Sequence, residues 1–220
     1  PQVETVKKRK PGWWAIPLKD VKTANLFMIY VVNDRFIIAY SENPIASDRC
    51  FHRIFPYEGY EVKSIAAILN STITIFNIEI YGRSNLGLGA LKFEAMDAKQ
   101  IPIVTPRAIK STMKDKMWTA FEKLRDREVG SIFQEIGASS PEEVSLDKVK
   151  PDRRELDKIV MGEILGLTDE EQLEVYRAVV DLVKSRLEKA GSFGNNPKTQ
   201  NGIYVYELRK SAVERFIKEP

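Results

Sequence analysis

One stretch, residues 61–106, most constrains what this chain can fold into, because several kinds of pattern follow one another there without a break. The stretch begins with a predicted short apolar helix over 65–69, which ends at Asn70-Ser71, and continues with a β-branched and aromatic run over 72–81. A loop that contains Gly82, Gly87 and Gly89 comes next, and a predicted strand over 101–104 follows it. Pro106 closes the strand. No pattern typical of a catalytic site lies in this stretch, so its interest is architectural.

The residues before this stretch favour strands. Two apolar runs flank Asn33-Asp34 between residues 26 and 40, which predicts a β-hairpin with both faces covered. Residues 41–47 are expected to form a loop. Residues 48–55 predict a further strand, with Phe51 and Ile54 pointing inward.

After Pro106 the pattern becomes helical. A Met and aromatic stripe, which is typical of a core rather than of a cofactor site, and two predicted capping boxes, Ser140 to Glu143 and Thr168 to Glu171, mark successive helices. Pro151 is expected to begin one helix and Gly166 to end it. The inward-facing residues are expected to be Met113, Met117, Phe121, Leu124, Leu156, Ile159, Val160, Ile164, Leu173, Tyr176, Val180, Val183 and Leu187.

The order of these pieces resembles the TaqI-like C-terminal specificity domain of adenine-specific DNA methyltransferases, whose relatives include type I restriction specificity subunits. The residues that carry the resemblance are Asp48 to Phe51 with Pro56, Ile68 to Thr72, Gly87 to Gly89, and Lys99 to Pro106. Residues 154–190 are similar to the helical tail of adenine-type DNA methylases. Together these matches extend over most of residues 12–190.

The patterns and the resemblance together predict an α+β fold, with a mixed-sheet recognition domain followed by a helical region. We expect a DNA target recognition domain over 1–106, a helical region over 107–190, and a linker with a C-terminal arm over 191–220. The resemblance implies a fragment of a restriction-modification methyltransferase, with duplex DNA and a catalytic methyltransferase domain or subunit as partners.

The motifs of catalysis are missing from this sequence. Adenine methyltransferases of this kind carry Asn/Asp-Pro-Pro-Tyr/Phe, which holds the flipped base, whereas Asn43-Pro44 is followed here by Ile45. A glycine-rich turn for S-adenosylmethionine is absent as well, so that cofactor is expected for the parent enzyme and none for this chain. The residues are therefore expected to recognise DNA without carrying out the transfer.

Charge points to the first half as the partner-binding half. Residues 1–110 hold 15 Lys and Arg against 10 Asp and Glu, whereas residues 111–220 hold 19 against 21. Loop placement beside cations or aromatic rings predicts a set of DNA contacts: Lys8, Arg9, Lys10, Trp13, Arg49, Arg53, Arg83 and Asn85. The basic run at residues 7–10 could equally be a solvated surface.

Several classes are disfavoured. A single Cys50 and a single His52 build neither a disulfide framework nor a zinc site, and together with the lack of an apolar leader they predict a cytoplasmic protein with no membrane segment. A start at Pro1 is what an excised fragment would show. Two other readings stay open: a separate specificity subunit, and a protein-interaction module built on residues 107–190.

Overall fold

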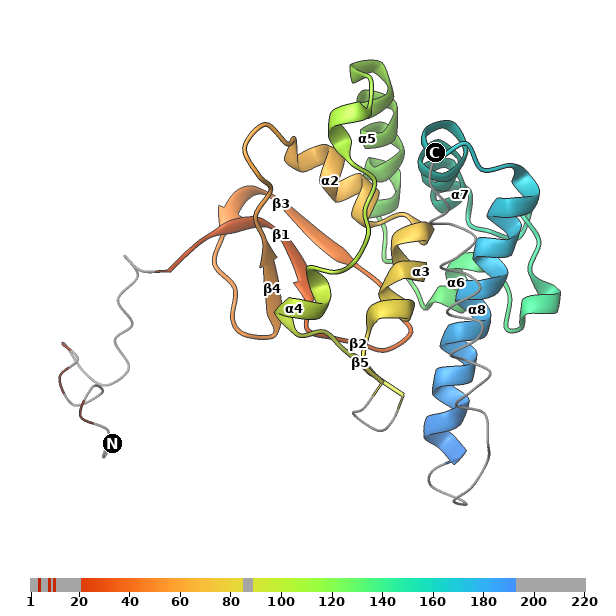
Figure 1. Cartoon of the computed structure of the whole chain (residues 1–220), viewed down its shortest axis with the longest axis horizontal. Coiled ribbons are helices and arrows are strands. Elements are labelled where there is room, and N and C mark those ends of the chain that lie inside the picture. Colours follow the sequence, from red (N-terminus) through yellow and green to blue (C-terminus); the bar gives the residue numbers. More distant parts are fainter. Residues whose placement is uncertain (1–3, 5–7, 9, 11–20, 85–88, 193–220) are drawn as a thin grey trace.

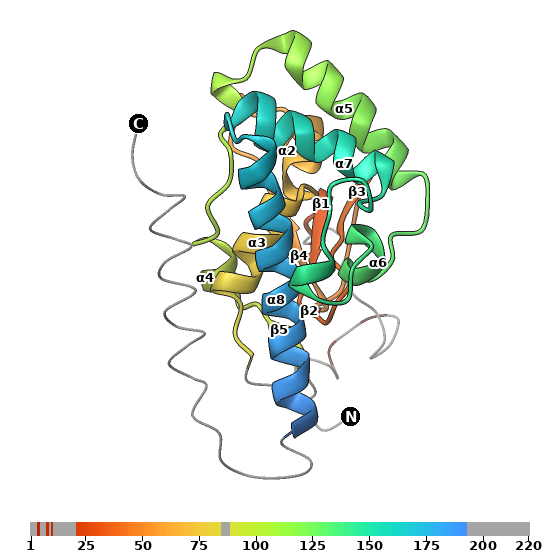
Figure 2. The same cartoon turned by 90° about the vertical axis from the view of Figure 1, so that its right-hand side faces the viewer.

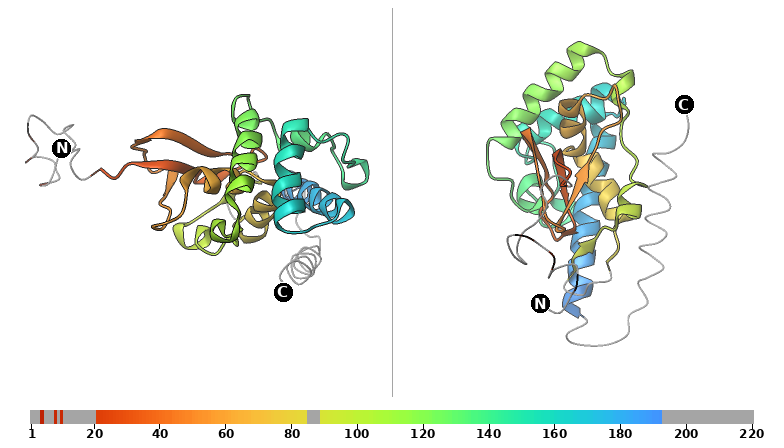
Figure 3. Two further views of the ribbon diagram at one scale, coloured as in Figure 1. Left: turned by 90° about the horizontal axis from the view of Figure 1, so that it is seen from above. Right: turned by 90° about the vertical axis from the view of Figure 1, so that its left-hand side faces the viewer.

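The computed structural model describes residues 4, 8, 10, 21–84 and 89–192, and the fold is α+β, as predicted. Figure 1 shows a small sheet on one side of the molecule, with α3 between that sheet and the long helix α8. Seen from above in Figure 3, the strands gather at one end and the later helices at the other.

The main sheet has three antiparallel strands, β1 (Ala24–Ile29), β3 (Ile38–Ile45) and β4 (Phe51–Ile54), in the order β3-β1-β4. Met28 pairs with Ile38, so the predicted hairpin is confirmed. The prediction that both faces of the hairpin are covered holds for the central strand β1, where the neighbouring residues Leu26 and Phe27 are both buried. It is wrong for β3, which is mostly exposed.

The loop expected over residues 41–47 is wrong, because β3 continues to Ile45. The register between β1 and β3 shifts between Ala24 and Leu26. At this irregularity the Asn25 amide donates hydrogen bonds to the carbonyl oxygens of Ser41 and Glu42. A side chain thus satisfies the backbone groups that the bulge leaves unpaired.

The strand expected over 48–55 is confirmed in β4, but the inward direction of Phe51 is wrong. Phe51 is 40% exposed, while Ile54 is half-buried opposite Leu26. Residues three apart on a strand face opposite sides, so Phe51 and Ile54 cannot both point inward. His52, opposite Met28, takes the inward place instead.

Two consecutive helices follow, α2 (Val62–Leu69) and α3 (Thr72–Tyr81). The first confirms the predicted helix that ends at Asn70. The second occupies the β-branched and aromatic run, whose secondary structure the sequence left open. Seven of the ten α3 residues are buried, and α3 packs against α2, α7 and α8, so tertiary burial outweighs the strand preference of its side chains.

A second, two-stranded sheet joins β2 (Val31–Val32) to β5 (Leu91–Lys92) and precedes the short helix α4 (Ala95–Ala98). The strand predicted over 101–104 is wrong, because this segment forms no regular secondary structure and pairs with no strand in the described structure. Pro102 has no N–H to donate to a ladder. Its carbonyl accepts instead from the Asn77 amide at 3.0 Å.

The helical region contains η2 (Pro106–Ala108), α5 (Ser111–Arg125), α6 (Ile132–Ile136), η3 (Pro141–Glu143), α7 (Pro151–Asp157), the π-helical η4 (Lys158–Ile164) and α8 (Asp169–Ser192). The predicted stripe is confirmed: its members are buried except Met113, Ile164, Leu173 and Leu187, which are half-buried. Figure 2 shows α8 running along one side of the molecule.

Helix starts and stops follow the sequence in most places. Pro151 begins α7, and Gly166, with a φ of 74°, follows the end of η4. The Thr168 and Glu171 side chains form the expected capping box. The box expected from Ser140 to Glu143 is wrong: Glu143 accepts from the Ser139 N–H, and only one 3-10 turn forms there.

One connected core holds the strands and helices together. The cluster of buried apolar residues runs from Leu26 in the sheet to Val183 on α8. In the described part of the chain no single helix is long and apolar enough to cross a membrane. Among the described helices, only α2 and α3 taken together meet the length and composition of a span, and their axes are bent by 70° where the two helices meet.

Candidate nucleic-acid interface

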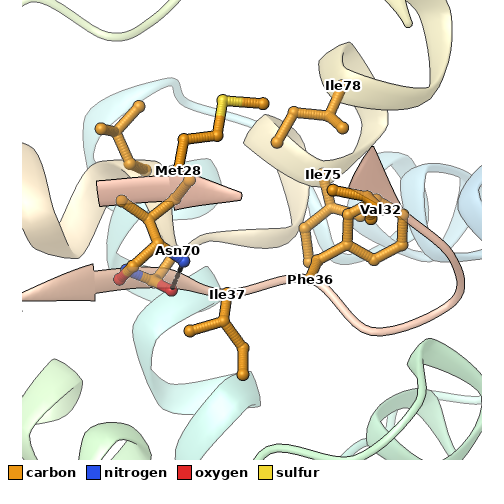
Figure 4. A pocket seen from close by; sticks show the side chains of 9 residues that line it. Met28, Val32, Phe36, Ile37, Asn70, Ile75 and Ile78 are labelled. Carbon is orange, nitrogen blue, oxygen red and sulfur yellow. Dashed lines mark hydrogen bonds between the residues drawn. The ribbon is translucent and has the colours of Figure 1, made fainter. Parts of the chain in front are cut away.

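The segment Ile68 to Thr72, which carries much of the family resemblance, is a structural hub. Asn70 is buried at the end of α2, where its amide nitrogen donates to the carbonyl oxygens of Ile38 and Ala66, both at 2.9 Å. Its side-chain oxygen accepts from the Ile38 N–H at 3.1 Å. Figure 4 shows Asn70 directed at β3 within an apolar surround. The void beside it holds only about 10 Å³, too small for more than one water, so this place is no ligand site.

Thr72, two residues after Asn70, is hydrogen-bonded to the helical region. Thr72 donates from its backbone N–H and its hydroxyl to the Asp157 carboxylate, at 2.7 and 2.6 Å. Tyr176 on α8 donates to the same carboxylate at 2.9 Å. Burial raises the pKa of Asp157, and the nearby positive charge of Arg153 opposes that shift. Asp157 therefore joins α3, α7 and α8 through hydrogen bonds rather than serving a reaction.

The predicted DNA contacts fall into three groups: exposed residues, residues outside the described part of the chain, and Arg83, which a carboxylate holds in place. Lys8 and Lys10 are exposed, as are Arg49 before β4 and Arg53 within it. The Arg53 guanidinium donates to the Lys22 carbonyl at 2.9 Å and lies on the sheet face opposite His52 and Ile54. Outside the described residues lie Arg9, Trp13 and Asn85.

Arg83 is held in place by a carboxylate. Its Nε and Nη2 both donate to Oδ1 of Asp97, at 3.0 and 2.6 Å. Burial would raise the pKa of Asp97, but hydrogen bonds from the Glu94 N–H and from Arg83 lower it below its usual value. The Arg83 side chain remains about half exposed, so one edge of the guanidinium is fixed while the rest faces solvent.

A polar cluster that no sequence pattern indicated lies beside Arg83. Lys92, which bridges to Arg83 through the backbone, pairs with Glu94 at 2.6 Å. Tyr30 donates to Glu94 at 2.8 Å, and its ring lies against His52. These residues come from three separate segments, so only the fold brings them together. Hydrogen bonds from Lys92 and then from Tyr30 lower the pKa of Glu94.

The glycine-bearing loop returns onto α8. Gly89 adopts a φ of +70°, and a Cβ at that position would approach Cα of Leu187 to 3.1 Å. Its carbonyl accepts a hydrogen bond from Arg186, which also reaches the Asn33 carbonyl at 2.6 Å. Gly89 thus supplies both the left-handed backbone and the close approach that this loop needs.

An apolar groove of about 570 Å³ opens on the inner face of the main sheet. Its floor and walls come from the sheet, from α2 and α3, and from the segment 95–106. The large hydrophobic side chains that are exposed at its edge are Phe55, Tyr57 and Ile103. Sequence reasoning missed this groove because its walls are far apart along the chain.

Comparison with known proteins gives one family. No curated protein and no solved structure matches the chain significantly. The family model of the type II methyltransferase M.Eco57I, C-terminal domain, matches residues 4–138, which is more than half of the 220 residues. The match begins before β1, includes the resemblance segments between residues 48 and 106, and ends just after α6; the segment 154–190, likened above to a helical tail, lies outside it. The chain therefore belongs to the family of type II methyltransferase C-terminal domains represented by M.Eco57I.

Proposed function

We propose that this chain is the target-recognition part of an adenine-specific, S-adenosylmethionine-dependent DNA methyltransferase of a restriction-modification system. It binds duplex DNA and positions it for a catalytic domain that lies outside this sequence. Family membership is the observation that carries this proposal. A cytoplasmic location follows from the same role.

Cations placed on rigid supports give the proposal its physical basis. Arg49 lies two residues before β4, Arg53 lies within it, and both are exposed. Arg83 is fixed by Asp97 at the foot of the glycine-bearing loop. Arginines held by a scaffold can meet phosphates or the O6 and N7 acceptors of guanine with little loss of side-chain entropy.

The division of labour rests on the sequence. Without the Asn/Asp-Pro-Pro-Tyr/Phe motif, no residue of this chain is expected to hold a flipped adenine for transfer. The catalytic domain would supply that motif and the cofactor. Adenine as the target base comes from the resemblance of Ile68 to Thr72 and Lys99 to Pro106 to adenine-specific enzymes.

Salt-dependent binding tests the proposal. The purified chain should bind duplex DNA with an affinity that falls steeply as salt is added, since each neutralised phosphate contributes about 0.9 to the slope. The Lys8→Ala/Arg9→Ala/Lys10→Ala variant should lower that slope by about two to three units on any sequence. Arg83→Ala should weaken binding by roughly 5- to 150-fold on the cognate site and much less on random duplexes.

Lys123→Ala is the matched control, because Lys123 is an exposed cation on α5 that pairs with Glu155. Like Arg83→Ala, it removes one positive charge, but from the helical region. It should leave the affinity for DNA and the salt dependence of that affinity close to those of the parent. A parent chain that binds no duplex at low salt would overturn the proposal. So would a triple variant and an Arg83→Ala variant that both bind like the parent.

A further inference from the structure

We propose that the apolar groove between the main sheet and the segment 95–106 binds an unpaired nucleobase of a DNA strand. The inference deepens the proposed DNA-binding role and rests on it. A duplex presented to this chain would then be bound more tightly where one base is already free of its partner.

The groove has the volume and the buried apolar walls that a flat ring requires. Buried apolar residues of the sheet and of the two following helices form its inner part, among them Met28, Ile38, Ile65 and Ile78. Its volume of about 570 Å³ lies within the range of small-molecule sites. These walls can exclude water from both faces of a base.

Aromatic side chains stand at the mouth. Phe55 is 53% exposed and Tyr57 is 84% exposed, although both are large and apolar. Tyr60 lies between them and α2, half-buried, with the Arg107 guanidinium 4.7 Å from its ring centroid. Two solvent-facing rings, with a cation on a third ring nearby, provide the kinds of contact on which single-stranded nucleic acids stack.

The charge of the lining points to an anionic strand. No Asp or Glu is among the described residues that line the groove, in a chain that holds 31 of them. Lys99 lines it and is exposed, and Arg107 lies beside it over Tyr60. Glu58 and Glu61 are near in sequence but do not line it. A lining with cations and without carboxylates complements the phosphates on either side of an inserted base.

A groove with rings, aliphatic walls and only positive charge could also receive an apolar protein segment. An apolar segment would gain nothing from a lining whose charges are all positive, whereas a nucleotide would stack on the rings and pair its phosphates with the cations. The observations therefore favour the nucleobase, and a protein partner becomes an outcome of the test.

The test compares three DNA forms with the full chain: a matched duplex, the same duplex with one unpaired adenine in the middle, and a single strand. The parent should bind the bulged duplex more tightly than the matched one. Phe55→Ala and Tyr57→Ala should each weaken binding of the bulged duplex and of the single strand by about 5- to 150-fold, the range for losing one base–aromatic stack. Binding of the matched duplex should change less than about twofold.

Phe51→Ala is the matched control, since Phe51 is an exposed aromatic residue on β4, the strand that leads to Phe55, and does not itself line the groove. It should alter no DNA form. Lys99→Gln provides a second measurement that does not depend on stacking: it should lower the salt slope for the single strand by about 0.7. Circular dichroism melts of all variants check that each is folded.

The outcomes separate the two proposals. A matched duplex bound as tightly as the bulged one, with Phe55→Ala and Tyr57→Ala indistinguishable from Phe51→Ala, overturns the groove proposal and leaves duplex recognition standing; this is the result that a protein-binding groove would give. Binding of the bulged duplex and single strand without binding of any matched duplex supports the groove and overturns the recognition role proposed above.

Discussion

The Glu79 carboxylate on α3 accepts two hydrogen bonds from the Arg186 guanidinium on α8, at 3.0 Å from Nε and 2.7 Å from Nη2. Both side chains are at most 5% exposed, and 107 residues separate them. The same guanidinium reaches the carbonyls of Gly89 and Asn33. One buried ion pair thus fixes α8 to α3, and the same guanidinium links α8 to Gly89 and Asn33 of the first half.

Replacing Arg186 by Met should lower the free energy of unfolding by about 3–5 kcal/mol, because the buried Glu79 carboxylate would lose both charge-assisted hydrogen bonds from the guanidinium. Urea unfolding followed by circular dichroism measures the change. Arg177→Met on the same helix is the control, since its ion pair with Glu174 is exposed and should contribute less than about 1 kcal/mol. Equal losses for the two variants would contradict the role assigned to Arg186.

Asn70→Ala should destabilise the chain by at least about 2 kcal/mol, because it leaves the buried N–H and carbonyl of Ile38 without partners. Thermal unfolding gives the measurement. Asn77→Ala removes a single exposed hydrogen bond to Pro102 and should lose only about 0.5–1.5 kcal/mol. If Asn70→Ala melts no earlier than Asn77→Ala, the Ile38 backbone does not depend on this amide.

Acid should weaken the fold through Glu135. Burial alone would raise the pKa of Glu135, but hydrogen bonds from Arg127 and the charge of Arg153 outweigh it and hold that pKa well below its usual range. A depressed folded-state pKa gives stability that is present above the unfolded pKa, about 4.3, and is lost as the pH falls toward the folded value. The free energy of unfolding should therefore decrease below about pH 4.3, by up to roughly 1.4 kcal/mol per pH unit for this group.

Glu135→Gln should be less stable than the parent at neutral pH, since Arg127, Lys150 and Arg153 all donate to this carboxylate, and its stability should depend less on pH between about 4 and 2. Denaturant unfolding at a series of pH values compares the slopes. Glu128→Gln removes an equal charge from the surface. If it flattens the acid dependence as much as Glu135→Gln does, the buried network is not the cause.

The chain alone should transfer no methyl group from S-adenosylmethionine to duplex DNA, because the base-holding motif is absent from the sequence. Incorporation of a radiolabelled methyl group into DNA is the measurement, with an active adenine methyltransferase as the positive control. Methylated adenine produced by the purified chain would show that the catalytic site had been misplaced.

Much of the secondary structure follows from local patterns. The hairpin around Asn33-Asp34, the helix that ends at Asn70, and the start of α7 at Pro151 were predictable because turn residues, caps and apolar spacing act over a few residues. The capping box of Thr168 and Glu171 is of the same kind. Each of these depends on neighbours along the chain.

Other assignments failed or stayed open for a shared reason. Thr72–Tyr81 is a helix because it is buried against α2, α7 and α8, and β3 continues past residue 41 because Asn25 bonds to it from another strand. The segment 101–104 is not a strand in the described structure, since a strand needs a partner edge that its own residues cannot provide. In each case a contact distant in sequence decides the outcome.

The sequence by itself determined the fold class, several helix boundaries and the family, because local spacing and motif order are properties of the chain. Only the tertiary structure decided what those motifs do. Asn70 and Thr72 proved to be structural links to Ile38 and Asp157, and the aromatic groove is formed by segments that meet in space alone. Burial and side-chain contact depend on packing between distant segments, and no local pattern in the sequence specifies that packing.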